Sequence, residues 1–192
     1  MSTGPTRREI THDKIVEVAA RALRRNGFDG VGVADVMKQA GLTHGGFYAH
    51  FESREALLAE AVERAGRDTG VRLREHVDAC IARGENGLRA VIESYLSERH
   101  LTGTETGCVV AALSSEMPRQ PAAVAAPAAQ RVRKLIALVQ HAAPTGSKEQ
   151  AMVIASTLVG TLQLARTLGA NAQGRALLAA SRDALLAQYV AD

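Results

Sequence analysis

Residues 43–51 bring together side chains that could hydrogen-bond to a nucleic acid. The polar members of this stretch are Thr43, His44, Tyr48 and His50. Their hydroxyl and imidazole groups have the reach needed for phosphate oxygens and base edges. Gly45 and Gly46 carry no side chains, so the backbone there could approach a partner closely. Each glycine costs a helix about 1 kcal/mol relative to alanine, so helix stability alone does not account for the pair.

The two cysteines offer thiol chemistry at separate places in the chain. Cys108 follows Gly107 at the expected start of a helix, where the helix dipole favours the reactive thiolate. This position predicts a thiol that an electrophile or an oxidant could modify. The alternative is a small buried hydrophobic residue, which is the common fate of an unpaired cysteine. Cys80 lies near an expected helix end, and we assign it a structural role.

Other catalytic and metal-binding patterns are missing from the sequence. Ser114-Ser115-Glu116 lacks the glycines of a nucleophile elbow, and there is neither a phosphate-binding loop nor a dinucleotide fingerprint. The cysteines are 28 residues apart, which fits no zinc spacing. The remaining histidines are scattered: His12, His76, His100 and His141. We therefore expect no enzyme activity, no cofactor and no metal.

The composition predicts an all-α protein. The chain has 192 residues, of which 46% are hydrophobic, only 3% are aromatic and 35 are alanine, the best helix former. No run of 18 apolar residues is present, so we expect no membrane span. The polar N-terminus lacks the apolar stretch of a signal peptide, which predicts a cytoplasmic protein. A net charge of +3 is too small to argue for a nucleic-acid partner by itself.

Apolar periodicity and breaker residues predict about nine helices. Their expected ranges are 12–26 with Thr11 as N-cap, 34–40, 43–51, 53–82 with Ser53 as N-cap, 85–101, 106–117, 121–144, 147–168 and 173–190. Gly41 joins the second and third of these as a helix-turn-helix, whose second helix lies in the major groove of DNA. In that helix we expect Phe47 and Phe51 to face the core and Tyr48 to face DNA.

The N-terminal part of the chain resembles the TetR family of transcriptional repressors. The resemblance lies within a head of about 47 residues and is most specific at GFYAHFESR, residues 46–54. Further matching strings are IVEVAA at 15–20, NGF at 26–28, VMKQAGLT at 36–43 and SREALL at 53–58. One position departs from the pattern, because Val33 stands where the family often has a capping serine or threonine at the start of the second helix.

The resemblance implies a homodimeric repressor that binds a palindromic operator in double-stranded DNA and is released by a small-molecule effector. Residues 1–54 would form the DNA-binding head, and residues 55–192 a helical domain for ligand binding and dimerisation. The implied DNA-contacting residues are Thr43, His44, Gly45, Gly46, Tyr48, His50 and Arg54. Of these, Thr43, Tyr48, His50 and Arg54 would contact the DNA backbone, while His44 and Gly46 would meet base edges. Arg7 and Arg8 could form a basic arm in the minor groove or a solvated tail.

An effector site would lie among the helices of the second domain. The candidate residues are Tyr95, His100, Cys108, Leu113, Glu116, Met117 and Gln163. Further apolar candidates are Val109, Leu135, Leu138, Leu158 and Leu162, each of which could equally be ordinary core. A helix-turn-helix protein without a ligand and a helical enzyme remain the alternative functions.

Two apolar stripes near the C-terminus have two interpretations. The stripes are Ile154, Leu158, Thr161, Leu162, Ala165 and Leu168, followed by Leu178, Leu185, Leu186 and Tyr189. They could pack against a second copy of the chain, as the resemblance implies, or within the monomer.

Overall fold

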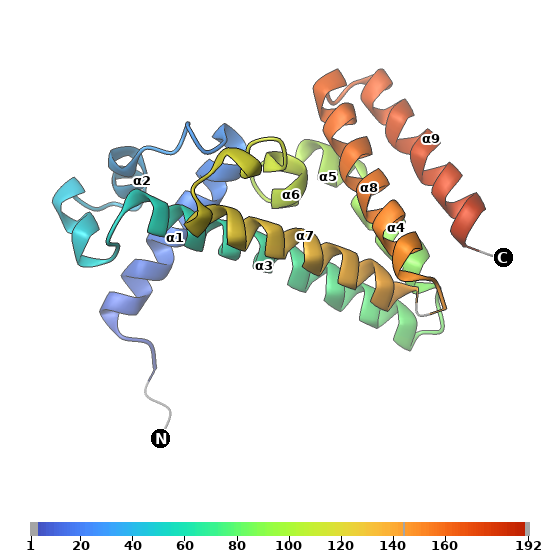
Figure 1. The fold of residues 1–192 in the computed structure, drawn as a ribbon, viewed down its shortest axis with the longest axis horizontal. Helices are drawn as coiled ribbons and strands as arrows, with labels where there is room; N and C mark the ends of the chain where they lie inside the picture. Colours follow the sequence, from blue (N-terminus) through green and yellow to red (C-terminus); the bar gives the residue numbers. More distant parts are fainter. Residues whose placement is uncertain (1–3, 144, 191–192) are drawn as a thin grey trace.

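The fold is a bundle of helices, described by a computed structural model for residues 4–143 and 145–190. Within these ranges there are nine α-helices, two 3₁₀ helices and no strand (Figure 1). The elements are α1 Arg7–Asn26, α2 Val33–Gln39, η1 His44–Ala49, α3 Arg54–Ala82, α4 Gly87–Tyr95, α5 Glu98–Thr102, α6 Val109–Leu113, η2 Met117–Arg119, α7 Ala122–Ala142, α8 Lys148–Leu168 and α9 Ala172–Tyr189. The predicted all-α class is confirmed.

The first helix begins earlier than predicted, because Thr6 rather than Thr11 is its N-cap. Thr6 Oγ1 accepts a hydrogen bond from the backbone N–H of Glu9, and the Glu9 carboxylate accepts one from the Thr6 N–H at 2.7 Å. This reciprocal capping box satisfies two N–H groups that would otherwise lack partners. Arg8 therefore lies in the first turn of α1, where its guanidinium donates to the Ala49 carbonyl at 2.8 Å.

Two of the expected helices are wrong in extent. The helix predicted over 85–101 is divided into α4 and α5, because the Ser97 hydroxyl caps a new helix by accepting from the His100 N–H at 3.2 Å. The helix predicted over 106–117 is reduced to the five residues of α6, and serines, which favour caps and turns, follow it. The expected helix end at Pro144 falls outside the described residues, and α7 ends at Ala142.

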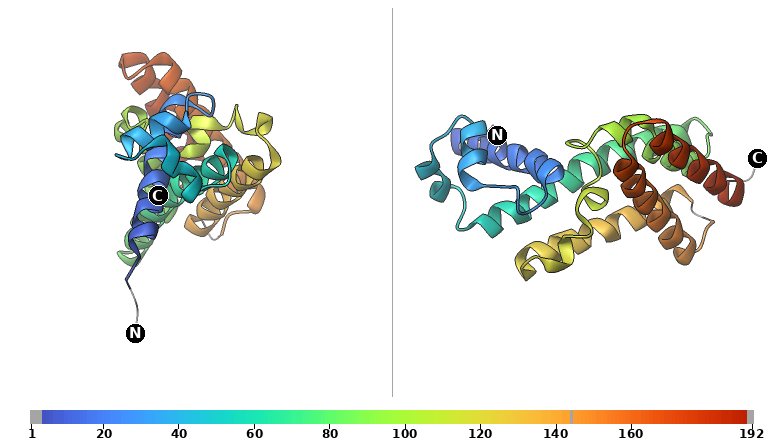
Figure 2. Two further views of the ribbon diagram at one scale, coloured as in Figure 1. Left: turned by 90° about the vertical axis from the view of Figure 1, so that its left-hand side faces the viewer. Right: turned by 90° about the horizontal axis from the view of Figure 1, so that it is seen from above.

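The 29-residue helix α3 is the longest helix that the structure describes, and it contacts both the head and the body. It packs against α1 at its N-terminal end and runs beside α7 in the same direction, with Glu63 paired to Arg131 and Asp78 paired to His141 (Figure 1). Helices α8 and α9 form a hairpin at the far end from α1 and α2 (Figure 2). One buried apolar cluster runs from α1 to α9, so the head and the body share a continuous core.

Helix α8 is the one described helix long and apolar enough to cross a membrane by length and composition. It is also a core helix of the bundle, since Ile154, Leu158 and Leu162 on it are almost completely buried. This side of the predicted stripe therefore packs within the monomer.

Candidate functional site

The turn between α2 and η1 requires a glycine. Gly41 has φ +75°, a left-handed conformation that residues with a Cβ rarely adopt. The turn is closed by hydrogen bonds from the Gly41 N–H to the Lys38 carbonyl at 3.0 Å and from the Leu42 N–H to the Met37 carbonyl at 2.9 Å. The helix-turn-helix geometry predicted around Gly41 is therefore built from local backbone bonds.

The expected third α-helix is a 3₁₀ helix. The Gly46 N–H donates to the Thr43 carbonyl at 3.1 Å and the His50 N–H donates to the Phe47 carbonyl at 2.9 Å, the i to i+3 pattern of that tighter helix. Two adjacent glycines of low helix propensity and the lack of a side-chain cap explain the difference.

The aromatic residues in and just after η1 are divided between the core and the surface as predicted. Phe47 and Phe51 are only 2% and 3% exposed, and their rings stack with centroids 5.4 Å apart. Tyr48 is 73% exposed although its ring contacts the edge of Phe47 at 5.2 Å. Thr43, His44 and Gly45 are exposed beside it. The outer face of η1 is thus a polar surface supported by a rigid aromatic core.

His50 is held partly inside the head, at the end of η1. Its ring lies 5.9 Å from that of His12, and its Nδ1 atom is buried without a hydrogen-bond partner among the described residues. Burial lowers the pKa of His50, and the neighbouring His12 and Arg8 lower it further. His50 is therefore mainly neutral at pH 7.

Arg54 holds the loop between α1 and α2. Its Nε donates to the Val31 carbonyl at 3.1 Å, and its Nη2 donates to the Phe28 carbonyl. These contacts fix the loop that leads into α2, so Arg54 positions the helix-turn-helix from within the protein.

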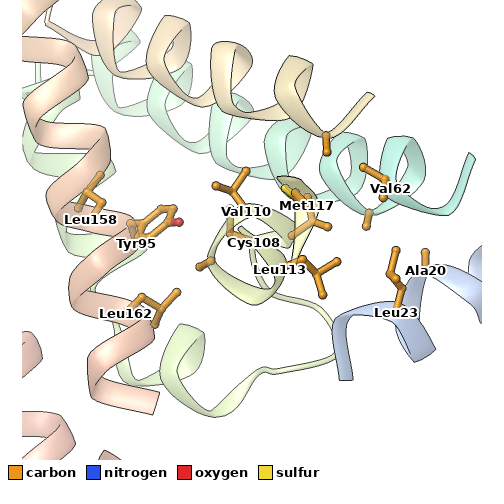
Figure 3. Close-up of a cluster of buried hydrophobic side chains, with 14 of the residues drawn as sticks. Ala20, Leu23, Val62, Tyr95, Cys108, Val110, Leu113, Met117, Leu158 and Leu162 are labelled. Atoms are coloured by element: carbon orange, nitrogen blue, oxygen red, sulfur yellow. The ribbon is translucent and has the colours of Figure 1, made fainter. Parts of the chain in front are cut away.

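A cavity of about 420 Å³ lies in the body, between α3, α4, α6 and α7. It is lined by Gly66, Arg67, Thr69, Gly70, Val71, Leu73, Arg74, Glu75, Tyr95, Cys108, Val109, Val110, Arg131, Lys134, Leu135, Ala137 and Leu138. Its volume is in the range of small-molecule sites. Of the predicted effector residues, Tyr95 and Cys108 lie on its wall. Figure 3 shows Tyr95 pointing toward Val110 and Cys108.

Five of the seven expected effector residues lie outside this cavity, namely His100, Leu113, Glu116, Met117 and Gln163. Because α6 is so short, the chain turns after Leu113 and carries Leu113 and Met117 toward α1 and α3 (Figure 3). Gln163 instead donates to the Ser114 hydroxyl at 2.9 Å, and the Glu116 carboxylate accepts from the Phe28 N–H at 2.9 Å. Of the further apolar candidates, Leu158 and Leu162 also lie outside, whereas Val109, Leu135 and Leu138 line the cavity.

His100 lines a neighbouring, more polar hollow and supports the cavity wall from behind. Its Nδ1 lies 2.8 Å from the Tyr95 carbonyl, and its Nε2 accepts from the Cys108 N–H at 2.9 Å. These contacts require the neutral ring, with the proton on Nδ1. Burial and the nearby Arg166 together lower the pKa of His100 to about 4, against the opposing effect of the hydrogen bond to the Tyr95 carbonyl, and this favours the same form.

Sequence reasoning missed the contacts that join the head to the cavity wall. Arg24 Nε donates to the Glu105 carbonyl at 2.5 Å, and Arg25 forms an ion pair of 3.0 Å with the Glu105 carboxylate. Glu116 adds a second contact between the head and this segment, because its carboxylate accepts a hydrogen bond from the Phe28 N–H. The segment from Glu105 to Glu116 therefore both contacts α1 and its following loop and contributes Cys108 to the cavity.

Arg131 was also missed, and it lies across Gly66. A Cβ at Gly66 would come within 1.9 Å of Arg131 Cδ, so only glycine leaves room for this side chain. Arg131 Nη2 donates to the Glu63 carboxylate at 2.6 Å. A glycine inside a long helix was the one available signal for such a close approach.

Comparisons with known proteins agree with the geometry of the head. Residues 15–61 match the family described as bacterial regulatory proteins, tetR family. The chain is 32% identical over 169 residues to an uncharacterized HTH-type transcriptional regulator, MT0206, of Mycobacterium tuberculosis (strain CDC 1551 / Oshkosh), covering 80% of this chain and 83% of that relative. It is 25% identical over 167 residues to the HTH-type transcriptional repressor NemR of Escherichia coli (strain K12), covering 86% and 84%.

Solved structures share the whole fold. The reduced form of E. coli NemR superposes with a TM-score of 0.77 at 21% identity, covering 93% of this chain and 97% of that one. A TetR transcriptional regulator from Chloroflexus aurantiacus J-10-FL gives a TM-score of 0.73 at 20% identity, covering 94% and 96%. These relatives and neighbours are transcriptional regulators rather than enzymes. The chain belongs to the TetR family and is a DNA-binding transcriptional regulator.

Proposed function

We propose that this regulator is a cytoplasmic homodimeric repressor, released from a palindromic operator when a small molecule binds in its body. Residues 1–54 act as the DNA-binding head, and residues 55–192 bind the effector and the second subunit. The observation that carries this proposal is the exposed polar face of η1, held rigid by the buried rings of Phe47 and Phe51. A rigid support is what a base-reading surface needs.

The proposed DNA-contacting residues in and around η1 divide into two roles. Thr43, Tyr48 and His50 position the protein on the DNA backbone, and Arg54 adds a phosphate contact while holding the loop. His44 meets base edges, and Gly45 and Gly46 let the backbone come close. Both glycines leave room for such an approach, since a Cβ at Gly45 would have no neighbour within 4 Å and one at Gly46 would make only ordinary contacts.

Point variants test these roles by fluorescence anisotropy with DNA from upstream of the protein's own gene. Tyr48→Phe removes one phosphate hydrogen bond, worth about 1 kcal/mol, and should weaken binding to all sequences about fivefold. Tyr189→Phe, far from η1, is the matched control. His44→Ala should instead change the preference at one base pair of each half-site. The assignment is wrong if Tyr48→Phe alters preference and His44→Ala does not.

Dimerisation is supported by an uncovered apolar row on α8. Met152, Leu164 and Leu168 are 41%, 60% and 44% exposed, and they lie on one row of i+4 spacing that passes through Gly160. A Cβ at Gly160 would meet nothing within 4 Å, so the row is open for a second helix to approach. A two-fold dimer built on this row would place two heads on successive major grooves, about 34–36 Å apart.

A charge placed on this row should break the dimer. Leu164→Glu is expected to convert the protein from dimer to monomer in light scattering coupled to size exclusion. Val132→Glu, at another exposed apolar position on α7, should leave the dimer intact. A dimeric Leu164→Glu variant would rule out this interface.

Release is supported by the connection between cavity and head. A ligand that displaces the wall around Cys108 would move the segment that Arg24, Arg25 and Phe28 contact. Such a ligand shifts the population toward a head arrangement that binds DNA less tightly, and operator DNA must weaken ligand binding by the same factor.

Electrophiles are one way to displace that wall. The Cys108 thiol lines the cavity, so it could add to the β-carbon of N-ethylmaleimide or a related enone. A sulfur–carbon bond forms, and the thiol proton is transferred to the α-carbon. Release of operator by N-ethylmaleimide should then vanish in Cys108→Ser and persist in Cys80→Ser, the matched control. Unchanged release in Cys108→Ser would leave Cys108 as a buried structural residue.

A further inference from the structure

The cavity in the body has an apolar interior and a cationic rim. Its interior is formed largely by Val109, Val110, Leu135 and Leu138. Its exposed charged residues are Arg67 and Arg74 on α3, Lys134 on α7, and one carboxylate, Glu75. The rim therefore carries an excess of positive charge at the entrance to an apolar space.

Two of these cations have no partner of opposite charge. Arg74 forms an ion pair of 3.1 Å with Asp78. Arg67 and Lys134, by contrast, make no ion pair with any residue that the structure describes. Both side chains line the cavity and are exposed, so an anion at the rim would have two cations available that no described carboxylate pairs with.

Two polar groups in the cavity wall are buried without partners. Tyr95 is 2% exposed and Arg131 is 6% exposed. Among the described residues neither the Tyr95 hydroxyl, which lies near the Cys108 thiol, nor Arg131 Nε has a hydrogen-bond partner. Burial raises the pKa of Tyr95 well above its ordinary value, so the phenol keeps its proton and remains a donor at neutral pH. Both unsatisfied groups donate hydrogen bonds. A buried donor without an acceptor destabilises the fold, and a ligand that supplies an acceptor would remove this cost.

We infer that the effector is a small lipophilic anion, of which a medium-chain carboxylate is the simplest form. Its apolar chain fills the space between Val110, Leu135 and Leu138, and its carboxylate lies among the cations of α3 and α7. Carboxylate oxygens accept hydrogen bonds only, which matches the donors in the wall and the cations of the rim. A cation would be repelled by the rim, and a neutral alcohol could accept a hydrogen bond but would lack the ionic attraction to the rim cations.

Calorimetric titration of the free, full-length protein with octanoate, 1-octanol and octylamine tests this inference. Octanoate should bind about tenfold more tightly than 1-octanol, the order expected of one charge-assisted hydrogen bond. Octylamine should bind more weakly than either. Equal affinities for octanoate and 1-octanol, or no binding of octanoate, would overturn the inference.

Variants at the rim locate the anion. Arg67→Gln combined with Lys134→Gln changes two exposed side chains, so the fold is retained. This double variant should lower octanoate affinity to the level of 1-octanol and leave 1-octanol unchanged. Arg133→Gln, exposed on α7 but outside the cavity, is the matched control and should bind octanoate normally. Unchanged octanoate binding in the double variant, or equal loss of both ligands, would contradict the assignment.

This inference rests on the proposed effector response, and the two fail in different ways. Octanoate that binds the free protein but leaves operator binding unchanged would contradict release by this ligand and not the anion preference. Protein that binds no operator at all would contradict the proposed repressor. If 1-octanol bound as tightly as octanoate and released the operator, the preference for an anion would be refuted while the proposed repressor function would stand.

Discussion

The partly buried imidazole of His100 makes stability depend on pH in a predictable way. Its ring accepts from the Cys108 N–H and contacts the Tyr95 carbonyl, so the folded protein requires the neutral form. Burial lowers its pKa from 6.5 to about 4 in the folded protein, while the unfolded chain keeps the ordinary value. As pH falls from about 6.5 to 4, the unfolded state takes up this proton and the folded state does not. The contribution of the neutral His100 ring to the free energy of unfolding is therefore complete above about pH 6.5 and is lost as the pH falls toward 4.

The size of this loss follows from the two pKa values. A difference of one pKa unit corresponds to about 1.4 kcal/mol, so His100 alone should lower the free energy of unfolding by about 3 kcal/mol by pH 4. Other groups titrate in the same range, but they are common to a variant that lacks only this imidazole. His100→Gln keeps an acceptor for Cys108 and a donor for Tyr95, and it does not titrate.

Urea unfolding between pH 7.5 and 4 measures the difference. The wild-type protein should lose about 3 kcal/mol more than His100→Gln over this interval. His44→Gln, at an exposed histidine, should follow the wild-type curve. Parallel curves for wild type and His100→Gln would refute the argument that this ring is buried in its neutral form.

Two further substitutions test packing across the molecule. Gly66→Ala places a Cβ against Arg131 and should destabilise the fold by about 1–2 kcal/mol in urea unfolding, whereas Gly70→Ala in the same helix meets open space and should stabilise it by up to about 1 kcal/mol. Equal effects would show that Arg131 does not lie across Gly66. Glu116→Ala leaves the Phe28 N–H without an acceptor and should cost about 1–3 kcal/mol, while Glu116→Gln should cost less. A Glu116→Ala protein as stable as wild type would remove that contact from the account.

The sequence predicts what local chemistry decides. Ser53 is the N-cap of α3 as expected, because its hydroxyl precedes a strong apolar period, and its Oγ accepts from the Ala56 N–H. Phe47 and Phe51 are buried as expected, and the Phe51 N–H donates to the Phe47 carbonyl at 3.0 Å just beyond the end of η1. The prediction of Thr11 as the N-cap of α1 was wrong, because Thr6 also has an acidic residue in the following turn and its reciprocal bond with Glu9 makes it the cap.

Contacts between distant residues were beyond prediction. Glu116 could be given a polar role but not its partner, because Phe28 is 88 positions away and offers a backbone N–H that any residue has. In the sequence Arg131 is indistinguishable from a surface cation, and only the structure shows that its side chain packs against Gly66. The cavity depends on where α6 ends, and the turn after Leu113 carries Leu113, Glu116 and Met117 away from it.

A titration with operator DNA shows whether the protein binds a palindromic site as a dimer. Labelled duplex DNA from upstream of the protein's gene is titrated with the full chain, and anisotropy is followed at several salt concentrations. The account predicts saturation at two chains per palindromic site, with affinity that falls steeply as salt rises and exceeds that for a scrambled duplex by about a thousandfold or more. Equal affinity for the palindromic and scrambled duplexes would contradict it.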